Sequence, residues 1–293
     1  MTPSPKGWLL AGAMVISFSP VMVKIAADSQ LGPTAIAFWR TGLGAGFLLI
    51  LALGRRRGLW LSVGAFGYAA LAGVFFFVDL TCWHRSIIYV GTGMATILGN
   101  TQVFVTALLS WFIFKERLSL MFILSVIAAF GGLVLLVGAG SDQVEFTSEY
   151  VTGVALGLAT GVAYSAYIIC LKKGTTQAVP TDLVTFMAVA SLFSTVGLVI
   201  GANLFGEVLI PPDLKALLAV GGLGLVVHCL AWLAITGALP KVKTAQAGLI
   251  LLLQPILSAV WGVLFFGERL TGLQVLGAAI TLVAMYLGSL QKR

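Results

Sequence analysis

Several ionisable side chains lie inside long apolar stretches of this 293-residue chain, among them Lys24, Asp79 and His228. A charge at the centre of a bilayer costs at least about 2.5 to 3.5 kcal/mol, so such groups are candidates for contact with a polar solute. A structural role is the alternative for each. Lys24 would reach the outer headgroups, Asp79 would pair with Lys24 or Arg85, and His228 would hydrogen-bond within the protein. For Arg40 we expect a structural role, pairing with loop carbonyls or with Asp28.

Amides and deep aromatic residues are a second group with the chemistry to bind a solute. An amide inside a membrane must find a partner, and a neighbouring helix supplies one about as often as a ligand does. Aromatic rings would accept amphipathic solutes by stacking, and would attract a substrate amine by cation-π interaction. The candidate substrate-binding residues are Lys24, Asp79, Asn100, Gln102, Tyr164, His228, Trp232 and Gln254.

The composition indicates an integral membrane protein. Hydrophobic residues make up 59% of the chain, charged residues 9%, and the mean hydropathy is +1.07, whereas a soluble domain is about 25% charged. The net charge of +7 comes from short basic clusters between apolar runs, which argues against nucleic-acid binding. Cys82, Cys170 and Cys229 have no pairing or metal-binding motif and are expected to pack between helices. We expect no cofactor and no metal, and the chain has no Walker motif for ATP.

Ten apolar runs are long enough to cross a bilayer, which needs roughly 20 residues per helix. They lie near residues 7–27, 34–53, 60–82, 91–113, 118–139, 151–171, 182–204, 214–237, 243–266 and 271–290. An open sheet edge would leave backbone groups unpaired in lipid. The expected fold class is therefore an all-α membrane protein with ten transmembrane helices.

The basic residues predict the orientation of these helices. A cytoplasmic N-terminus would place twelve basic residues inside, namely Lys6, Arg55, Arg56, Arg57, Lys115, Arg117, Lys172, Lys173, Lys241, Lys243, Lys292 and Arg293. Only Arg85, Lys215 and Arg269 would lie outside. This bias in short loops is a strong positive-inside signal. Both termini are expected to be cytoplasmic.

An internal repeat is visible in two short phrases, FKERL at 114–118 and FGERL at 266–270, each between two apolar runs. Gln102 and Gln254 share the same spacing. Five helices per copy is an odd number, so the second copy must enter the membrane inverted. We expect one repeat at 1–146 and an inverted one at 147–293. Inverted repeats favour two access states around a site near the midplane, and hence a transporter. The residues expected to cap and pin the repeat junctions are Glu116, Arg117, Glu268 and Arg269.

These features resemble the EamA-type drug/metabolite transporter superfamily. The resemblance rests on the two five-helix repeats, the Glu-Arg-Leu phrases, Ala245, Ala247 and the pair Gln254-Pro255. One departure is Val103, which stands where the second repeat has Pro255. Length and intramembrane aromatics look most like the bacterial aromatic amino acid exporters. The resemblance implies a cavity between the halves, lined by the first, third, fourth, sixth, eighth and ninth helices.

The expected function is secondary export of amino acids and related small metabolites by alternating access. The expected location is the bacterial inner membrane, and the expected partners are a small-molecule substrate and the lipid bilayer, without nucleic acid, for a protein that functions as a monomer. A non-transporting membrane scaffold or chaperone and an intramembrane enzyme remain alternatives. The sequence leaves open the substrate, the direction of transport and any coupling to protons.

Overall fold

The computed structural model describes residues 4–54, 60–115, 119–138, 144–177, 181–238, 241–242 and 250–290. The regular secondary structure of these residues is all helical, with short loops between the helices. Seven helical segments are long and apolar enough to cross a membrane, and three shorter apolar helices accompany them. The ten-helix all-α fold predicted from the sequence is confirmed.

Several helices of the described residues begin where the sequence offers a capping side chain. They are α1 Pro5–Ser17, α2 Ser19–Asp28, α3 Pro33–Gly54, α4 Val63–Val90, α5 Thr92–Asn100, α6 Gln102–Phe114, α7 Leu120–Leu136, α8 Ser148–Thr175, α9 Leu183–Leu204, α10 Leu214–Gly221, η1 Gly222–Ala231, α11 Trp232–Ala238, α13 Leu253–Phe266 and α14 Gly272–Ser289. Ser62, Thr147 and Asp213 each accept a backbone N–H of the first helical turn that follows them. Such caps satisfy N–H groups that have no partner within the helix. Neither α3 nor α5 shows a cap of this local kind.

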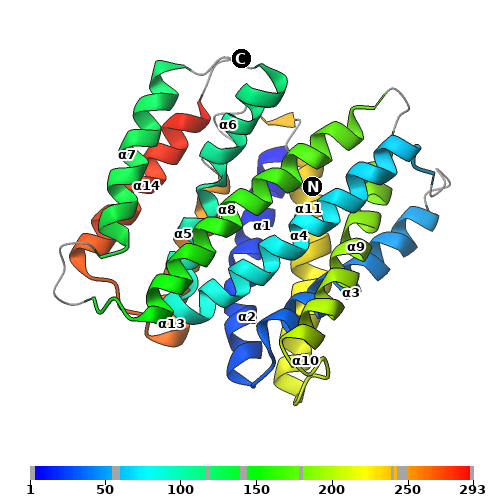
Figure 1. Cartoon of the computed structure of the whole chain (residues 1–293), viewed down its shortest axis with the longest axis horizontal. Helices are drawn as coiled ribbons and strands as arrows, with labels where there is room; N and C mark the ends of the chain where they lie inside the picture. The colour runs from blue at the N-terminus through cyan, green and yellow to red at the C-terminus, as the bar shows by residue number, and fades with distance from the viewer. Residues whose placement is uncertain are drawn as a thin grey trace.

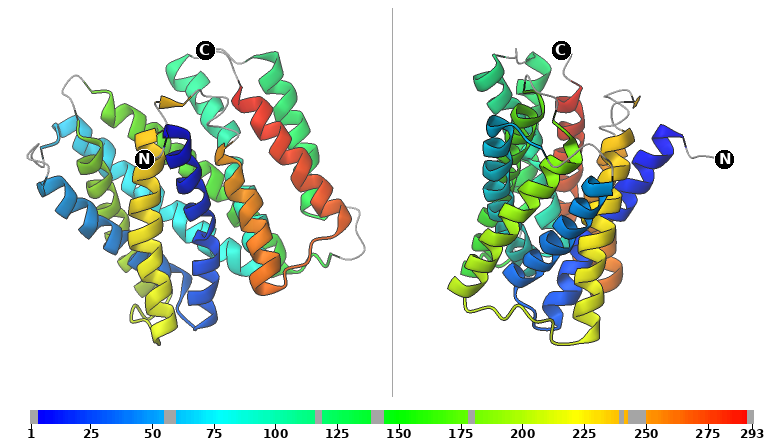
Figure 2. Two further views of the ribbon diagram at one scale, coloured as in Figure 1. Left: turned by 180° about the vertical axis from the view of Figure 1, so that it is seen from behind. Right: turned by 90° about the vertical axis from the view of Figure 1, so that its right-hand side faces the viewer.

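Helix pairing follows a twofold relation between the two halves. Each of α3, α5 and α7 packs against its counterpart in the second half, α9, α13 and α14 respectively. The pairing of α4 with α8 is matched by that of η1 and α11 with α1. Figures 1 and 2 show α7 and α14 side by side at one edge of the bundle. The chain is thus built as two inverted five-helix repeats.

Four spans differ in detail from the sequence prediction. The first is broken at Phe18, between α1 and α2, and the fourth at Thr101, between α5 and α6. The third was predicted to end at residue 82 because of Arg85, but α4 continues to Val90 and ends at Gly91. The eighth contains the π-helix η1. Arg85 stays helical because a carboxylate from the second half neutralises its charge.

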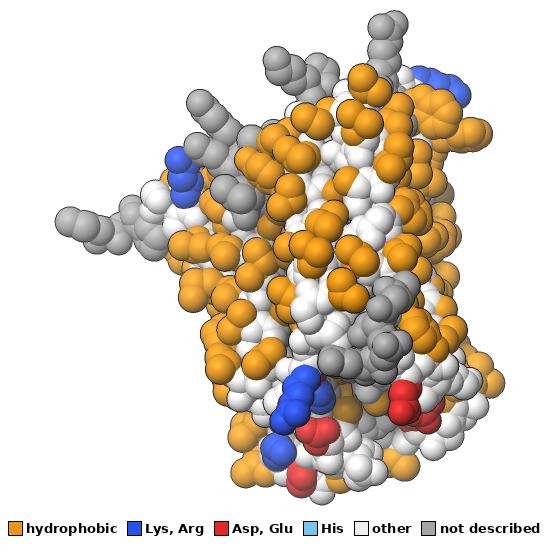
Figure 3. All heavy atoms as spheres, turned by 90° about the vertical axis from the view of Figure 1, so that its left-hand side faces the viewer, with side chains coloured by type: hydrophobic (Ala, Val, Ile, Leu, Met, Phe, Trp, Pro, Cys, Tyr) orange, Lys and Arg blue, Asp and Glu red, His pale blue; other side chains and the backbone are white. Residues whose placement is uncertain are grey.

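The sides of the bundle are apolar, as a lipid-facing surface requires. Figure 3 shows hydrophobic side chains over most of one flank, with charged side chains toward its ends. Close backbone contacts hold the helices together, because the hydrophobic effect contributes little to helix association in lipid. On α7 and α14, a Cβ added to Gly132 would lie 2.8 Å from the carbonyl oxygen of Gly277. Small residues at this crossing let the two backbones approach.

Candidate functional site

A cluster of aromatic rings lies between the two halves. Phe76 of α4 stacks on Tyr167 of α8 at 5.1 Å between ring centroids, and Tyr167 stacks on Tyr164 at 5.6 Å. Tyr164 meets Trp232 of α11 at 6.4 Å, and Phe76 also faces His228 of η1 at 5.6 Å. The structure therefore brings together Tyr164, His228 and Trp232, three of the candidate residues. We call the five rings the aromatic cluster.

His228 is held from two sides. Its Nε2 and the Ser191 hydroxyl are joined by a hydrogen bond of 3.0 Å. Its ring also packs on the backbone at Gly44, where an added Cβ would meet Cδ2 of the imidazole. Nδ1 is buried without a hydrogen-bond partner among the described residues. Stretches of π-helix such as η1 are frequent at functional sites. Here the π-helix places an imidazole with only one hydrogen-bonded nitrogen among the described residues against the other rings of the aromatic cluster.

Arg40 of α3 is the buried cation nearest to this cluster. The residue is 5% exposed, and its Nε and Nη1 lack a hydrogen-bond partner within the described part of the chain. Its guanidinium lies over the Trp83 ring, 5.5 Å from the centroid. The pairing with Asp28 or loop carbonyls expected from the sequence is not among the contacts of the described residues. A buried donor without an acceptor is costly, so the site is incomplete as it stands.

Asp79 of α4 is the matching buried acid. It is 5% exposed and interacts electrostatically with Arg40, yet no ion pair joins the two. Neither Lys24 nor Arg85, the structural partners expected from the sequence, pairs with it, because each is bound to a glutamate. Across the described residues the Asp79 carboxyl makes no hydrogen bond that would neutralise it. The two ionisable side chains are thus both buried and not joined by an ion pair.

The three candidate amides lie near helix breaks. The Asn100 side chain donates to the Thr96 carbonyl at 2.8 Å, one turn before the break at Thr101. Gln102 follows the break, and its side-chain oxygen accepts the Thr106 hydroxyl at 3.1 Å. Gln254 lies in the first turn of α13 and is half-buried. The fourth span is thus interrupted where its candidate polar residues lie.

Lys24 lies elsewhere, at the end of the bundle where Glu268 is found. Its Nζ is 2.7 Å from Glu268 Oε1. The same carboxylate accepts the Thr92 backbone N–H at 2.9 Å and the Thr92 hydroxyl at 3.0 Å. Glu268 therefore caps α5, which lacks a cap of its own, and it is paired with Lys24 rather than Arg269. Glu116 and Arg117, the corresponding residues of the first repeat, lie outside the described residues.

A second glutamate acts in the same way at this end. Glu207, between α9 and α10, accepts the backbone N–H of Thr34 at 2.7 Å and of Ala35 at 3.0 Å. Arg85 donates to its other oxygen at 2.8 Å. Helix N-termini favour negative charge, and both α3 and α5 receive it from a glutamate of the second half. We call the Glu268 and Glu207 contacts the two ties, and this end of the bundle the tied end.

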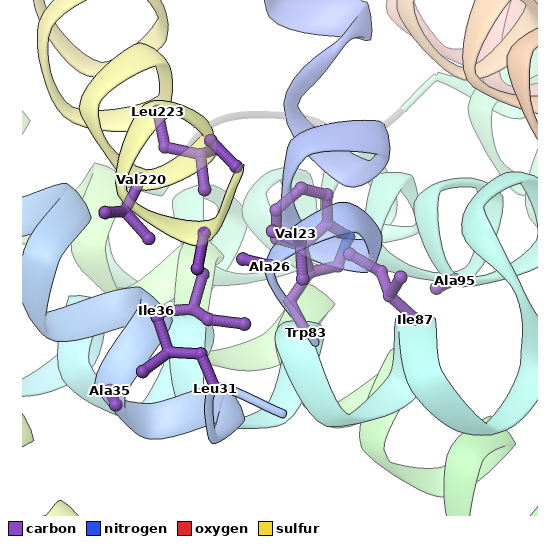
Figure 4. Packing of buried hydrophobic residues seen from close by; sticks show 12 residues of the cluster. Val23, Ala26, Leu31, Ala35, Ile36, Trp83, Ile87, Ala95, Val220 and Leu223 are labelled. Atoms are coloured by element: carbon purple, nitrogen blue, oxygen red, sulfur yellow. The ribbon is translucent and has the colours of Figure 1, made fainter. Parts of the chain in front are cut away.

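The tied end also has an apolar core and a pocket. Figure 4 shows Val23 and Ala26 of α2 between Val220 and Leu223 on one side and Trp83 and Ile87 on the other. Beside this core lies a cavity of about 320 Å³. Its lining includes Lys24, Tyr89, Tyr150, Glu268, Arg269 and Gln274. The pocket is thus separate from the aromatic cluster.

Arg40 and Trp83 were not identified as site residues from the sequence. Trp83 stands next to the predicted end of the third span, where a tryptophan is typical of the membrane interface, but it is 8% exposed within a longer α4. For Arg40 the sequence favours a structural role. The signal that distinguishes Arg40 is that Nε and Nη1 have no acceptor among the described residues, which only the packed structure reveals.

Comparison with known proteins matches these features to one family. Residues 6–138 and 151–290 match the EamA-like transporter family. The threonine/homoserine exporter RhtA of Salmonella typhimurium strain SL1344 is 31% identical over 210 residues, and the match covers 71% of this chain and 65% of that protein. A probable amino-acid metabolite efflux pump of Escherichia coli K12 is 27% identical, with 67% and 66% covered.

A solved structure shares the fold. A crystal structure aligns with 99% of this chain and 99% of its own, with a TM-score of 0.65 and 18% identity. At that identity the likeness concerns the fold alone. Both halves of the chain match the same family description, and the two bacterial relatives are described as an exporter and a probable efflux pump. The chain therefore belongs to the EamA-like transporter family.

Proposed function

We propose that this protein exports amino acids and related small metabolites across the bacterial inner membrane by alternating access. The observation that carries the proposal is the buried set formed by the aromatic cluster, Arg40 and Asp79 between the two halves. Unsatisfied polar groups beside an aromatic surface suit a solute with a charged end and an apolar end. Two of the similar proteins are described as exporters of amino acids or their metabolites, which supports this choice.

The moving units are the repeats 1–146 and 147–293, with both termini cytoplasmic. In this orientation the tied end faces the outside, and the structure represents a state closed toward the outside by the two ties. Outward opening requires Glu268 to leave Lys24 and Thr92, and Glu207 to leave Arg85 and Thr34. The side chains of both ion pairs are partly exposed, by 24% and 18% for Lys24 and Glu268 and by 16% and 11% for Arg85 and Glu207, so water can reach them as they separate.

Aromatic and large apolar amino acids are the substrates that the aromatic cluster fits best. Stacked rings such as Tyr164 and Tyr167 offer flat faces, and Trp232 borders them. Stacking and cation-π contacts are tolerant of side-chain shape. The exporter should therefore accept several related solutes rather than one.

Counterflow in proteoliposomes tests this function. Purified protein is reconstituted with a high internal concentration of one amino acid, and uptake of the same labelled amino acid is followed across a panel. We expect saturable counterflow, strongest for aromatic substrates, and a repeat with an imposed pH gradient tests proton coupling. Vesicles that show no exchange with any amino acid or metabolite would overturn the proposal and favour a scaffold or chaperone.

An intramembrane enzyme is the other rival. Metal-dependent chemistry would need clustered acidic, His or Cys ligands, and among the described residues no group of three forms such a cluster. Family membership favours transport. Chemical conversion of the labelled amino acid during counterflow would decide for the enzyme.

A further inference from the structure

We propose that Arg40 and Asp79 form a two-pole site that binds one amino acid by its α-carboxylate and its α-ammonium group together. This inference rests on the proposed function. It adds which charged group of the substrate each of the two residues binds. Neither residue is assigned a role by the similarity to known transporters.

Arg40 is the pole for the carboxylate. Two of its three guanidinium nitrogens, Nε and Nη1, are buried without a hydrogen-bond partner in the described part of the chain. A guanidinium binds a carboxylate through two parallel N–H donors, and Nε or Nη1 can each form such a pair together with Nη2. The Trp83 ring holds the group in place by a cation-π contact. Arg40 is therefore both unsatisfied and positioned.

Two other basic residues near the tied end each form an ion pair. Lys24 Nζ lies 2.7 Å from an oxygen of Glu268, and Arg85 Nη2 lies 2.8 Å from an oxygen of Glu207. Arg40 has Asp79 in electrostatic range but forms no ion pair with it. The fold thus joins two acid–base pairs of the same chemistry directly and leaves the third pair apart. A zwitterion placed between its members would complete both.

Asp79 is the pole for the ammonium group. It is as deeply buried as Arg40, with 5% of its surface exposed, and it lies one helical turn from Trp83 on α4. Phe76 of the aromatic cluster lies three residues before Asp79 on the same helix, so the aromatic cluster begins beside this carboxylate. An amino acid held at both poles would therefore direct its side chain toward these rings. The α-groups would fix the substrate, and the rings would tolerate different side chains.

Three probes separate the two poles. L-phenylalanine carries both charged groups, phenethylamine lacks the carboxylate, and 3-phenylpropionate lacks the amine. Binding of each to the purified full-length protein is measured separately by isothermal titration calorimetry. For the wild type we expect phenylalanine to bind about tenfold or more tightly than either single-charge probe, because each lost group leaves one buried charge without its partner.

Two substitutions should change these affinities in a crossed pattern. Arg40→Gln should weaken the binding of phenylalanine and of 3-phenylpropionate about tenfold. The affinity for phenethylamine should stay unchanged, because this amine has no carboxylate to bind Arg40. Asp79→Asn should weaken phenylalanine and phenethylamine and leave 3-phenylpropionate unchanged. Arg40→Lys should recover part of the carboxylate affinity. Lys215→Gln, an exposed cation at the start of α10, is the control and should change no affinity.

The outcomes distinguish this inference from the function on which it rests. If amino acids exchange in counterflow but the wild type binds all three probes equally, or if Arg40→Gln weakens all three alike, the two-pole site is wrong and the exporter stands. Absence of counterflow for the whole panel is the separate result that overturns the function. Should either variant fail to fold, the wild-type comparison of the three probes decides alone.

Discussion

Lys24 and Glu268, separated by 244 positions in the chain, are joined by a contact of 2.7 Å between Nζ and Oε1. Lys24 lies on α2 of the first half and Glu268 between α13 and α14 of the second. The carboxylate fits against Gly91 and Gly262, where an added Cβ would collide with it. One side chain therefore neutralises a cation, caps α5 and closes the seam between the two halves.

The ranking of substitutions at this contact is the first prediction. Lys24→Gln removes only a partly exposed ion pair and should lower the free energy of unfolding by about 1 kcal/mol or less. Glu268→Ala also leaves the Thr92 N–H unpaired, which should add about 1 to 3 kcal/mol. Glu268→Gln keeps an acceptor for Thr92 and should fall between the two. Melting temperatures in one detergent give the order, and equal losses for all three would show that the cap contributes nothing.

The second prediction concerns opening at the tied end. Thr96 lies one turn below Thr92 on α5 and is 2% exposed, so a cysteine there should react slowly with a membrane-impermeant maleimide. The background lacks Cys82, Cys170 and Cys229. Lys24→Gln should raise the labelling rate of Thr96→Cys several-fold, because the tie that closes this end is weaker.

Lys215→Gln in the same background is the matched loss of one positive charge on this end, and it should leave the rate unchanged. Equal rates for Lys24→Gln and its parent would mean that the ion pair does not hold the end closed. Labelling from the cytoplasmic side alone would instead contradict the proposed orientation.

The sequence predicted the ten spans because a bilayer imposes long apolar helices, and the two Glu-Arg-Leu phrases predicted the duplication. The prediction ended the third span too early. A charged residue such as Arg85 indicates a loop unless its partner, Glu207, is known. Contacts such as Lys24 with Glu268 depend on how the repeats dock, which no local pattern encodes.

The candidate site was harder to predict for the same reason. Asp79, Tyr164, His228 and Trp232 were chosen as polar or aromatic residues within spans, and the structure brings them near one another. Their binding role stays a prediction. Arg40 was left out because a cation close to a helix start has several ordinary partners. Only after packing is it evident that the described residues supply none of them.

The third prediction tests the packing of His228. Gly44→Ala would place a methyl group against the imidazole, so the ring must leave Ser191 and the Phe76 face. Overpacking of this kind costs typically about 1 to 3 kcal/mol. We expect a lower melting temperature and reduced counterflow.

Gly46→Ala is the control on the same helix. An added Cβ at Gly46 has nothing within 4 Å, so melting temperature and transport should stay at wild-type values or rise slightly. If both variants behave like the wild type, the position of His228 matters neither for stability nor for transport.

The fourth prediction concerns the polar residue before the break in the fourth span. Asn100→Ala removes a side chain whose one hydrogen bond among the described residues is to the Thr96 carbonyl of its own helix. Counterflow should fall while expression and monodispersity stay normal, because the half-buried amide is expected to face the substrate path. Wild-type rates for Asn100→Ala would remove this residue from the candidate site.

The last prediction separates ring contact with substrate from general loss of a tryptophan. Trp232→Ala removes one edge of the aromatic cluster beside Tyr164, and stacking is worth about 0.5 to 1.5 kcal/mol beyond area burial. Counterflow of aromatic amino acids should therefore need a several-fold higher concentration for half-maximal rate, while small amino acids change less. Trp111→Ala is the matched control, since that ring is 49% exposed on the flank of α6. An equal effect of both substitutions on every amino acid would mean that Trp232 supports the bundle without contacting substrate, and a shift confined to aromatic substrates would place it at the solute.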